Sequence, residues 1–176
     1  VDYYYRFKWT EIQDYTTGNF IYTTLDSKVH AAIDRGSRFN FGIMGHYPGQ
    51  GVQVDGSFLG YPLPVHNAMQ AEPVFKDWQD TRTDFPGYDS WTPNWNAPSF
   101  RAAYNKMIDS VVYHLKHTTY KGWNEWDVVG YVEIRTFGAT GEWTAYNLTT
   151  NKGGPTNSIA TAATQEQFID DFVARV

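Results

Sequence analysis

The stretch WDVVGYVEIRTFGATGEW, residues 126–143, decides which fold the sequence predicts. Val128 to Phe137 is rich in β-branched and aromatic residues and alternates in polarity, which predicts a strand. The alternation places Tyr131, Glu133 and Arg135 on one face. A strand with one apolar and one charged face is typical of a barrel whose helices cover the outside while its mouth holds a polar site.

Two glycines after this strand predict a sharp turn. Gly138 and Gly141 permit backbone angles that a side chain would obstruct, so the chain can present Glu142 at the rim of the fold. Glu142 is therefore the candidate catalytic residue. The alternative is a solvated loop carboxylate, which is the commoner role of a single glutamate after a strand.

Composition limits the class of protein. The 176 residues fit one domain with a real core, and no composition shift or linker divides them. A net charge of -5 and a pI near 5.4 argue against a nucleic-acid partner, which requires a basic surface. The sequence has no cysteine, hence no disulfide and no thiolate metal site. No apolar run approaches the length of a membrane span.

Aromatic residues are abundant and point to carbohydrate as the partner. They make up 18% of the chain, with 7 Trp and 13 Tyr, and many lie in stretches rich in Gly, Pro, Asn and Asp. Flat aromatic faces in loops suit sugar rings, which offer apolar C–H patches flanked by hydroxyls. The alternative is that large aromatic side chains fill the core, and this explains some of these residues.

Two earlier strands are predicted to carry polar faces as well. Residues 3–9 alternate with Arg6 and Lys8 on one face, and Arg38 to Tyr47 alternates with Asn40 and His46 on one face. His46 falls near the C-terminal end of its strand and is a candidate ligand-binding residue. A single histidine is more often a structural hydrogen-bonding group.

Apolar residues at helical spacing predict three helices. The first spans residues 24–36, with Thr24 as its N-terminal cap and Gly36 in a left-handed C-terminal cap. The second spans 99–117, capped by Asn96 or Ser99 with Pro98 in its first turn. For the last helix, Thr164-Gln-Glu-Gln167 predicts a capping box.

The region between the second strand and the second helix is the least regular. Residues 61–68 predict a short third strand, with Pro62 and Pro64 restricting its pairing to an edge or a strand start. The rest of residues 49–97 is expected to form a long excursion over the barrel mouth, carrying Trp78, Tyr88, Trp91 and Trp95.

The order of these elements predicts an α/β protein with parallel strands, namely the first half of a (β/α)₈ TIM barrel. Four segments carry a resemblance to a known family: YRFKWTEI at 5–12, DRG at 34–36, WTPNWNAPSF at 91–100 and YVEIRTFGATGEW at 131–143. In order and spacing they resemble the first four β/α units of the β-galactosidase-like glycoside hydrolases of clan A. The resemblance spans nearly all of the chain.

The resemblance implies that residues 1–176 are a single domain, the N-terminal half of such a barrel and a fragment whose partner is the remaining half. In that clan the general acid/base is a glutamate at the end of the fourth strand. Glu142 matches it, with Gly141 where the clan usually has asparagine. The nucleophile of a retaining hydrolase is a second carboxylate, expected at the end of the seventh strand and so outside this chain. The expected substrate-binding residues are His46, Trp91, Trp95, Trp143, Arg135, Glu133 and Arg6.

Two functions from different classes follow from these observations. One is a glycoside hydrolase acting on a poly- or oligosaccharide, with Glu142 as the acid. The other is a carbohydrate-binding or surface-recognition protein on a barrel scaffold without the chemistry. No cofactor or metal is expected, because the five histidines show no HExxH spacing and His114 and His117 are expected on a helix surface. A secreted protein, extracellular or periplasmic, is expected.

Three geometric expectations can be compared with a structure. Strands 3–9, 38–46 and 128–137 should lie parallel, with the first two helices on one side of them. The polar residues of these strands should converge, and Glu133 should pair with an arginine. The expected site is one cleft at the C-terminal ends of the strands, lined by Glu142, His46 and Trp143 with some of Trp91, Trp95 and Tyr88.

Overall fold

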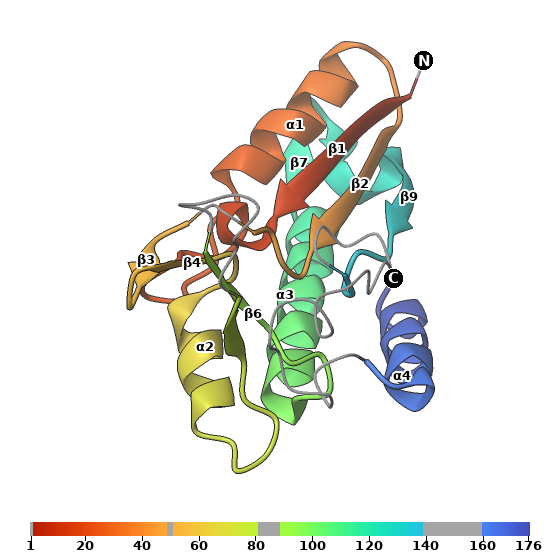
Figure 1. Ribbon diagram of the computed structural model, residues 1–176. Coiled ribbons are helices and arrows are strands. Elements are labelled where there is room, and N and C mark those ends of the chain that lie inside the picture. Colours follow the sequence, from red (N-terminus) through yellow and green to blue (C-terminus); the bar gives the residue numbers. More distant parts are fainter. Residues whose placement is uncertain (1, 49–50, 81–88, 139–159) are drawn as a thin grey trace.

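The computed structural model describes residues 2–48, 51–80, 89–138 and 160–176 (Figure 1). In this part of the chain, α-helices alternate with single strands or groups of strands, and the strands form one parallel sheet, one mixed sheet and one hairpin. The strands are β1 (Tyr3–Lys8), β2 (Phe39–Met44), β3 (Gln53–Val54), β4 (Ser57–Leu59), β5 (Trp78–Asp80), β6 (Ser90–Thr92), β7 (Thr119–Tyr120), β8 (Trp123–Asn124) and β9 (Val129–Glu133). The α-helices are α1 (Thr23–Asp34), α2 (Leu63–Gln70), α3 (Pro98–His117) and α4 (Ala162–Val173), and Trp9–Glu11 and Glu125–Val128 form the short 3₁₀ helices η1 and η2.

The first sheet, sheet A, has the order β1-β2-β9, and both of its strand pairs are parallel. Tyr3 pairs with Phe39, and Phe39 pairs with Val129. The expected parallel arrangement of the three strands is therefore confirmed. The last strand is shorter than predicted, because regular pairing ends at Glu133.

The TIM-barrel prediction is wrong. Sheet A has three strands, and the described chain forms two further sheets in place of more parallel β/α units. One has the order β3-β4-β6-β5, with β4 and β6 parallel but β3-β4 and β5-β6 antiparallel, and the other is the β7-β8 hairpin. A (β/α)₈ barrel requires one all-parallel sheet, and antiparallel pairs interrupt it.

Residues 61–68 do not form the predicted strand, because α2 begins at Leu63. Pro62 is the N-terminal cap and Pro64 lies in the first turn. Backbone N–H groups in a first turn have no partner within the helix, so proline is tolerated there. The two prolines that seemed to limit a strand instead start a helix.

The first helix ends as predicted, with Gly36 in the left-handed conformation at φ 61°. The N–H of Gly36 donates to the carbonyl of Ile33, and the N–H of Ser37 donates to that of Ala32. These two bonds form a Schellman motif and satisfy the last carbonyl groups of α1. The start differs slightly, since Tyr22 rather than Thr24 takes the capping position.

The caps of α3 and α4 differ from the predictions. Ala97 precedes α3, and the carboxylate of Glu72 accepts the N–H of Ser99 at 2.8 Å. The α4 helix starts earlier than predicted, with the hydroxyl of Thr161 accepting the N–H of Thr164 at 3.1 Å. The Asn96 side chain accepts the N–H of Thr161, so it supports α4 rather than α3.

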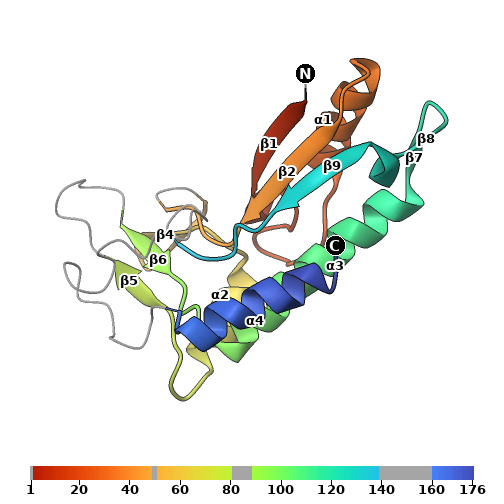
Figure 2. The ribbon, with the colours of Figure 1, turned by 90° about the vertical axis from the view of Figure 1, so that its right-hand side faces the viewer.

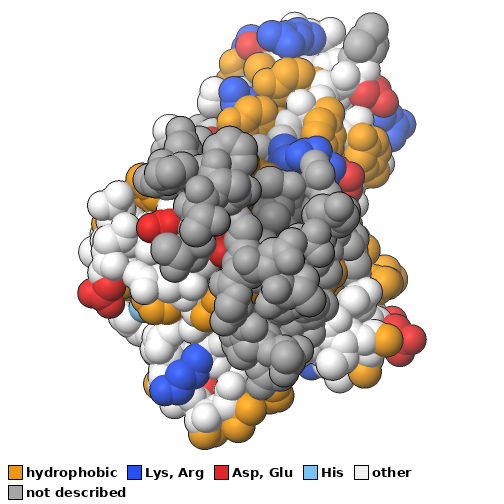
Figure 3. Space-filling view, in the orientation of Figure 1, with side chains coloured by type: hydrophobic (Ala, Val, Ile, Leu, Met, Phe, Trp, Pro, Cys, Tyr) orange, Lys and Arg blue, Asp and Glu red, His pale blue; other side chains and the backbone are white. Residues whose placement is uncertain are grey.

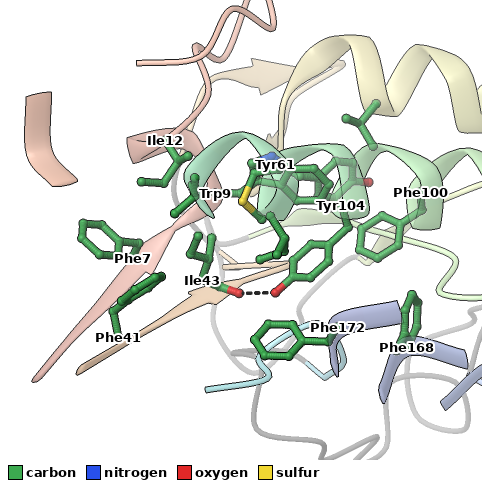
Figure 4. Packing of buried hydrophobic residues seen from close by; sticks show 14 of the residues in the cluster. Phe7, Trp9, Ile12, Phe41, Ile43, Tyr61, Phe100, Tyr104, Phe168 and Phe172 are labelled. Carbon is green, nitrogen blue, oxygen red and sulfur yellow. Dashed lines mark hydrogen bonds between the residues drawn. The ribbon is translucent and has the colours of Figure 1, made fainter. Parts of the chain in front are cut away.

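Figure 2 shows α1 and α3 on the same side of sheet A, as predicted. The apolar face of the sheet, with Phe7, Phe41 and Ile43, is buried against them. In Figure 4 the Tyr104 hydroxyl of α3 donates to the carbonyl of Ile43 at 2.6 Å. The core extends from there to α4, whose buried rings are Phe168 and Phe172. Among the described residues, no helix combines the length and apolar character required to cross a lipid bilayer.

Candidate functional site

The face of sheet A opposite α1 and α3 carries polar and aromatic side chains from all three strands. The strand register places Tyr4, Asn40 and Tyr131 in one row across the sheet. The Tyr4 and Tyr131 side chains are exposed, and their rings are stacked with centroids 6.3 Å apart. Asn40 is buried between them and accepts the backbone N–H of Tyr131 at 3.0 Å. We call this surface the open face.

A second row contains Arg6, Gly42 and Glu133. Arg135 lies over Gly42, where an added β-carbon would come within 2.7 Å of its Cγ. The guanidinium donates to Glu133 Oε1 at 2.7 Å, and the Tyr4 hydroxyl donates to Glu133 Oε2. The predicted pairing of Glu133 with an arginine is therefore confirmed, and Gly42 provides the room for it.

These contacts shift the pKa values of Glu133 and Tyr4 in opposite directions. Partial burial alone would raise the pKa of Glu133, but hydrogen bonds from Tyr4 and Arg135 outweigh it and hold the pKa below its usual value. Burial and the bond to Glu133 raise the pKa of Tyr4. At neutral pH, Glu133 is therefore an anion, and the Tyr4 hydroxyl is protonated and donates a hydrogen bond to it. Glu133 is a hydrogen-bond acceptor here rather than a proton source.

The open face also combines both signs of charge with aromatic surface. In Figure 3, which shows this side of the molecule, hydrophobic, basic and acidic side chains are intermingled above the grey atoms. Lys8 at the end of β1 lies 5.0 Å from the centroid of the Tyr47 ring. Such a surface can place flat rings against apolar patches of a ligand while carboxylate and guanidinium groups bond to its hydroxyls.

The other predicted site residues in the described chain lie at the C-terminal end of β2, and most are buried. His46 and Trp95 have 1% and 0% of their surface exposed. The Nε2 atom of His46 lies 3.1 Å from the carbonyl oxygen of Trp91, and the His46 and Trp95 rings are edge-on with centroids 6.4 Å apart. The structure brings the three together as expected. Their role in binding a ligand stays a prediction.

The half-buried Trp91 side chain makes one hydrogen bond and one ring contact that fix its position. Its indole N–H donates to the carbonyl of Val54 at 2.9 Å, and its ring packs edge-on against His66 at 4.6 Å. The remaining predicted site residues, Glu142, Trp143 and Tyr88, lie outside the described residues. The predicted cleft is therefore observed only in part.

The turn expected before Glu142 begins within the described chain. Gly138 has φ 95°, a conformation that favours glycine. The preceding residues lie against the end of β2, since the N–H of Gly45 donates to the carbonyl of Arg135 at 3.0 Å. Phe137 is buried, with its ring 5.0 Å from that of Trp95. Gly138 is the last described residue of this segment, so the rest of the predicted turn, with Gly141 and Glu142, lies outside the described residues.

No protein-family model and no curated protein matches this chain. Its function must therefore be argued from the residues themselves.

A buried polar network that the sequence reasoning missed joins α2 to the segment before β5. Asp77 Oδ2 accepts from the Tyr61 hydroxyl at 2.5 Å and lies 2.7 Å from His66 Nδ1. Gln70 donates to Asp77 Oδ1 at 2.5 Å. Tyr61, His66 and Asp77 are all buried. Burial and the neighbouring Asp77 raise the pKa of Tyr61 well above its usual value, so Tyr61 stays a donor to Asp77.

Among the described residues, one group of potential metal ligands lies on the helical side of sheet A. It consists of Asp26, His114 and Glu125. His117 is exposed, as expected, but His114 is half-buried and bonded to Asp26. The expectation of a surface position is therefore only partly met for these two histidines.

Proposed function

We propose that the protein binds an oligosaccharide or polysaccharide on the open face of sheet A. The observation that carries this proposal is the pair of exposed, stacked rings of Tyr4 and Tyr131 next to the Glu133–Arg135 ion pair. Sugar rings have apolar C–H faces that pack on aromatic rings. Their hydroxyl groups bond well to carboxylate and guanidinium groups.

The polar groups of the open face are already ordered. Glu133 is held by both Tyr4 and Arg135, and Arg135 is 7% exposed. Ordering side chains on binding costs affinity, so groups that are fixed beforehand bind more tightly. The mixture of one carboxylate with Arg6 and Arg135 supports a hydroxyl-rich ligand over a strongly charged one.

Replacing Tyr131 with alanine should weaken oligosaccharide binding about tenfold, because it removes one of the two aromatic faces. Tyr4→Phe should have a smaller effect, since it keeps the ring and loses only the bond to Glu133. Binding can be measured by calorimetry with soluble oligosaccharides and by affinity electrophoresis with polysaccharides.

The matched control is Tyr113→Ala, which removes a 65% exposed tyrosine from α3 on the other side of the sheet. The control should bind as wild type does. Equal affinity of Tyr131→Ala and wild type for every sugar that binds would contradict the open face as the binding surface.

A second candidate function is glycoside hydrolysis with Glu142 as general acid/base. One observation favours it, and a second excludes another carboxyl group. Arg135 lies against the end of β2, and Gly138, four residues before Glu142, has a φ of 95° that suits a turn. Glu133 has a lowered pKa and accepts two hydrogen bonds, which is unsuitable for an acid that must donate a proton. The acid would then be a different carboxyl group, and the family resemblance implies Glu142 for that role.

Glu142→Gln is expected to lower the hydrolysis of natural oligosaccharides by the full-length protein at least about 100-fold, because glutamine has no proton to give. Aryl glycosides should be less affected, since good leaving groups need less acid assistance. Glu166→Gln, an exposed residue of α4, is the control and should leave the rate unchanged.

The outcome also separates the two functions. Equal hydrolysis by wild type and Glu142→Gln would show that Glu142 is not the acid. Sugar binding without hydrolysis by either protein would support recognition without chemistry.

A further inference from the structure

Three elements meet on the helical side of sheet A, and each contributes one metal-ligating side chain. Asp26 lies in the first turn of α1, His114 in the last turn of α3, and Glu125 begins η2. One ligand atom from each lies within 4.8 Å of the other two. His114 Nε2 and Asp26 Oδ1 are the closest pair, 2.6 Å apart. The three residues are far apart in sequence and converge only in the folded chain.

Glu125 is the residue that indicates a ligand. Its side chain is fully buried, and Oε1 lies 2.7 Å from His30 Nε2. In the described part of the structure, Oε2 has no hydrogen-bond partner. A buried carboxylate oxygen without a partner is costly, more so than a neutral group in the same position. Burial raises the pKa of Glu125, and the nearby charge of Asp26 adds to this effect.

Both histidines next to these carboxylates are fixed in orientation. The His114 ring stacks on Tyr22 with centroids 3.8 Å apart, and the His30 ring stacks on Tyr120 at 3.7 Å. A ligand that is held in place by packing and by outer hydrogen bonds loses little entropy when a metal binds. His30 on Oε1 leaves Oε2 of Glu125 as the free ligand atom.

We propose that Asp26, His114 and Glu125 bind one divalent transition-metal ion, preferably Zn²⁺. One imidazole nitrogen and two carboxylate oxygens are ligands that Zn²⁺ accepts at about 2.0–2.2 Å. Ligand atoms at that distance in a tetrahedral site are about 3.4 Å apart. Small side-chain rotations would therefore produce the tetrahedral spacing. They would lengthen the contact between His114 Nε2 and Asp26 Oδ1 and bring Glu125 Oε2 closer to both atoms. The ion replaces the proton between His114 and Asp26, and its two positive charges balance two carboxylates.

The site would serve the fold rather than the open face. It joins η2 to α1 and α3, and Figure 2 shows both helices on one side of sheet A. Tyr4 and Tyr131 belong to the open face of the sheet. A bound ion therefore stabilises the packing of the two helices against the chain that leads into β9. Its loss should not remove sugar binding, so the two proposals can fail independently.

The first experiment uses wild-type protein dialysed against a chelator and then titrated with ZnCl₂ in a calorimeter. We expect one Zn²⁺ per chain, and a Tm rise of about 5–10 °C when free Zn²⁺ is 100 times the Kd. Mg²⁺, which requires octahedral oxygen ligands, should give no such rise. A wild-type protein that shows neither stoichiometric Zn²⁺ binding nor a Tm rise would overturn the proposal.

Variants then assign the ion to these residues. His114→Gln and Asp26→Asn should each weaken Zn²⁺ binding at least about tenfold. His117→Gln is the matched control, because His117 lies three residues further along α3, is exposed, and contacts Tyr113 through the backbone carbonyl and the ring. Circular dichroism verifies that each variant is folded. Unchanged Zn²⁺ affinity in both His114→Gln and Asp26→Asn would overturn the site, wherever else the ion binds.

Discussion

Trp9→Ala should destabilise the protein by about 3–5 kcal/mol, because it removes the largest fully buried side chain at the end of β1. The indole lies edge-on to Phe100 at 5.6 Å and to Tyr104 at 5.3 Å, and so joins sheet A to α3 (Figure 4). Its N–H also donates to Gln13 at 2.7 Å. Alanine leaves a cavity and an acceptor without its partner.

Urea denaturation measures this effect, with a Tm decrease of about 6–20 °C as the thermal equivalent. Trp123→Ala provides the matched control, since Trp123 is 58% exposed on the β7-β8 hairpin. The control should cost less than about 1 kcal/mol. Similar losses from the two substitutions would contradict the assignment of Trp9 to the core.

Asp77→Ala is expected to cost a similar amount, about 3–5 kcal/mol, for an electrostatic reason. The Asp77 carboxylate is the common acceptor for Tyr61, His66 and Gln70. Removing it leaves Tyr61 and His66 without this partner, whereas Gln70 keeps its bond to the backbone carbonyl of residue 77. Buried donors without an acceptor are costly, and here two buried donors, from Tyr61 and His66, are left at once.

Asp77→Asn tests whether charge or shape matters. The amide has one acceptor oxygen and one donor nitrogen, so its nitrogen would face a donor of either Gln70 or Tyr61. Most of the destabilisation should therefore remain. The control, Asp170→Ala, removes an exposed carboxylate of α4 and should change stability by less than about 0.5 kcal/mol. A small effect of Asp77→Ala would show that the network adds little to stability.

Sheet A could be predicted because each of its strands alternates in polarity. Phe7 and Phe41 mark the helical face of the sheet, while Arg6 and Glu133 mark the open face. A period of two fixes which side chains share a face, and a helix between two successive strands favours their parallel pairing because parallel strands need a crossover connection. Local sequence was therefore sufficient to predict that β1 and β2 are parallel and that Glu133 pairs with an arginine, and the structure identifies that arginine as Arg135.

The second sheet could not be predicted, because its strands are too short to show a period. Two or three residues form each of β3 to β6, and pairing between distant positions such as Phe58 and Ser90 defines them. The barrel prediction is wrong in this region, because β3 to β6 form a separate sheet instead of adding parallel strands to sheet A. Regular β/α units were predicted for this region, but pairing between residues that are distant in sequence determines its structure.

The candidate site was predictable where it depends on regular strands, and not where it depends on irregular chain. Trp95 lies in a segment rich in Pro and Asn that suggests an exposed loop, yet it is completely buried. His66 and Gln70 are four residues apart on one face of α2, a signal visible only once that segment is recognised as a helix. Asp26, His114 and Glu125 come from three separate elements, so no local spacing in the sequence indicates that they meet.

The strand order of sheet A also bears on the sequence of folding events. Pairing β1 with β2 closes the loop between Tyr3 and Phe39, whereas adding β9 closes a loop about two and a half times longer, from Phe39 to Val129. Loop closure depends only logarithmically on length, so the longer loop costs about 0.8 kcal/mol more in chain entropy. That difference is small against the burial that α3 provides. The rate at which β9 joins should therefore depend on how early α3 docks, and not on how far the chain must return.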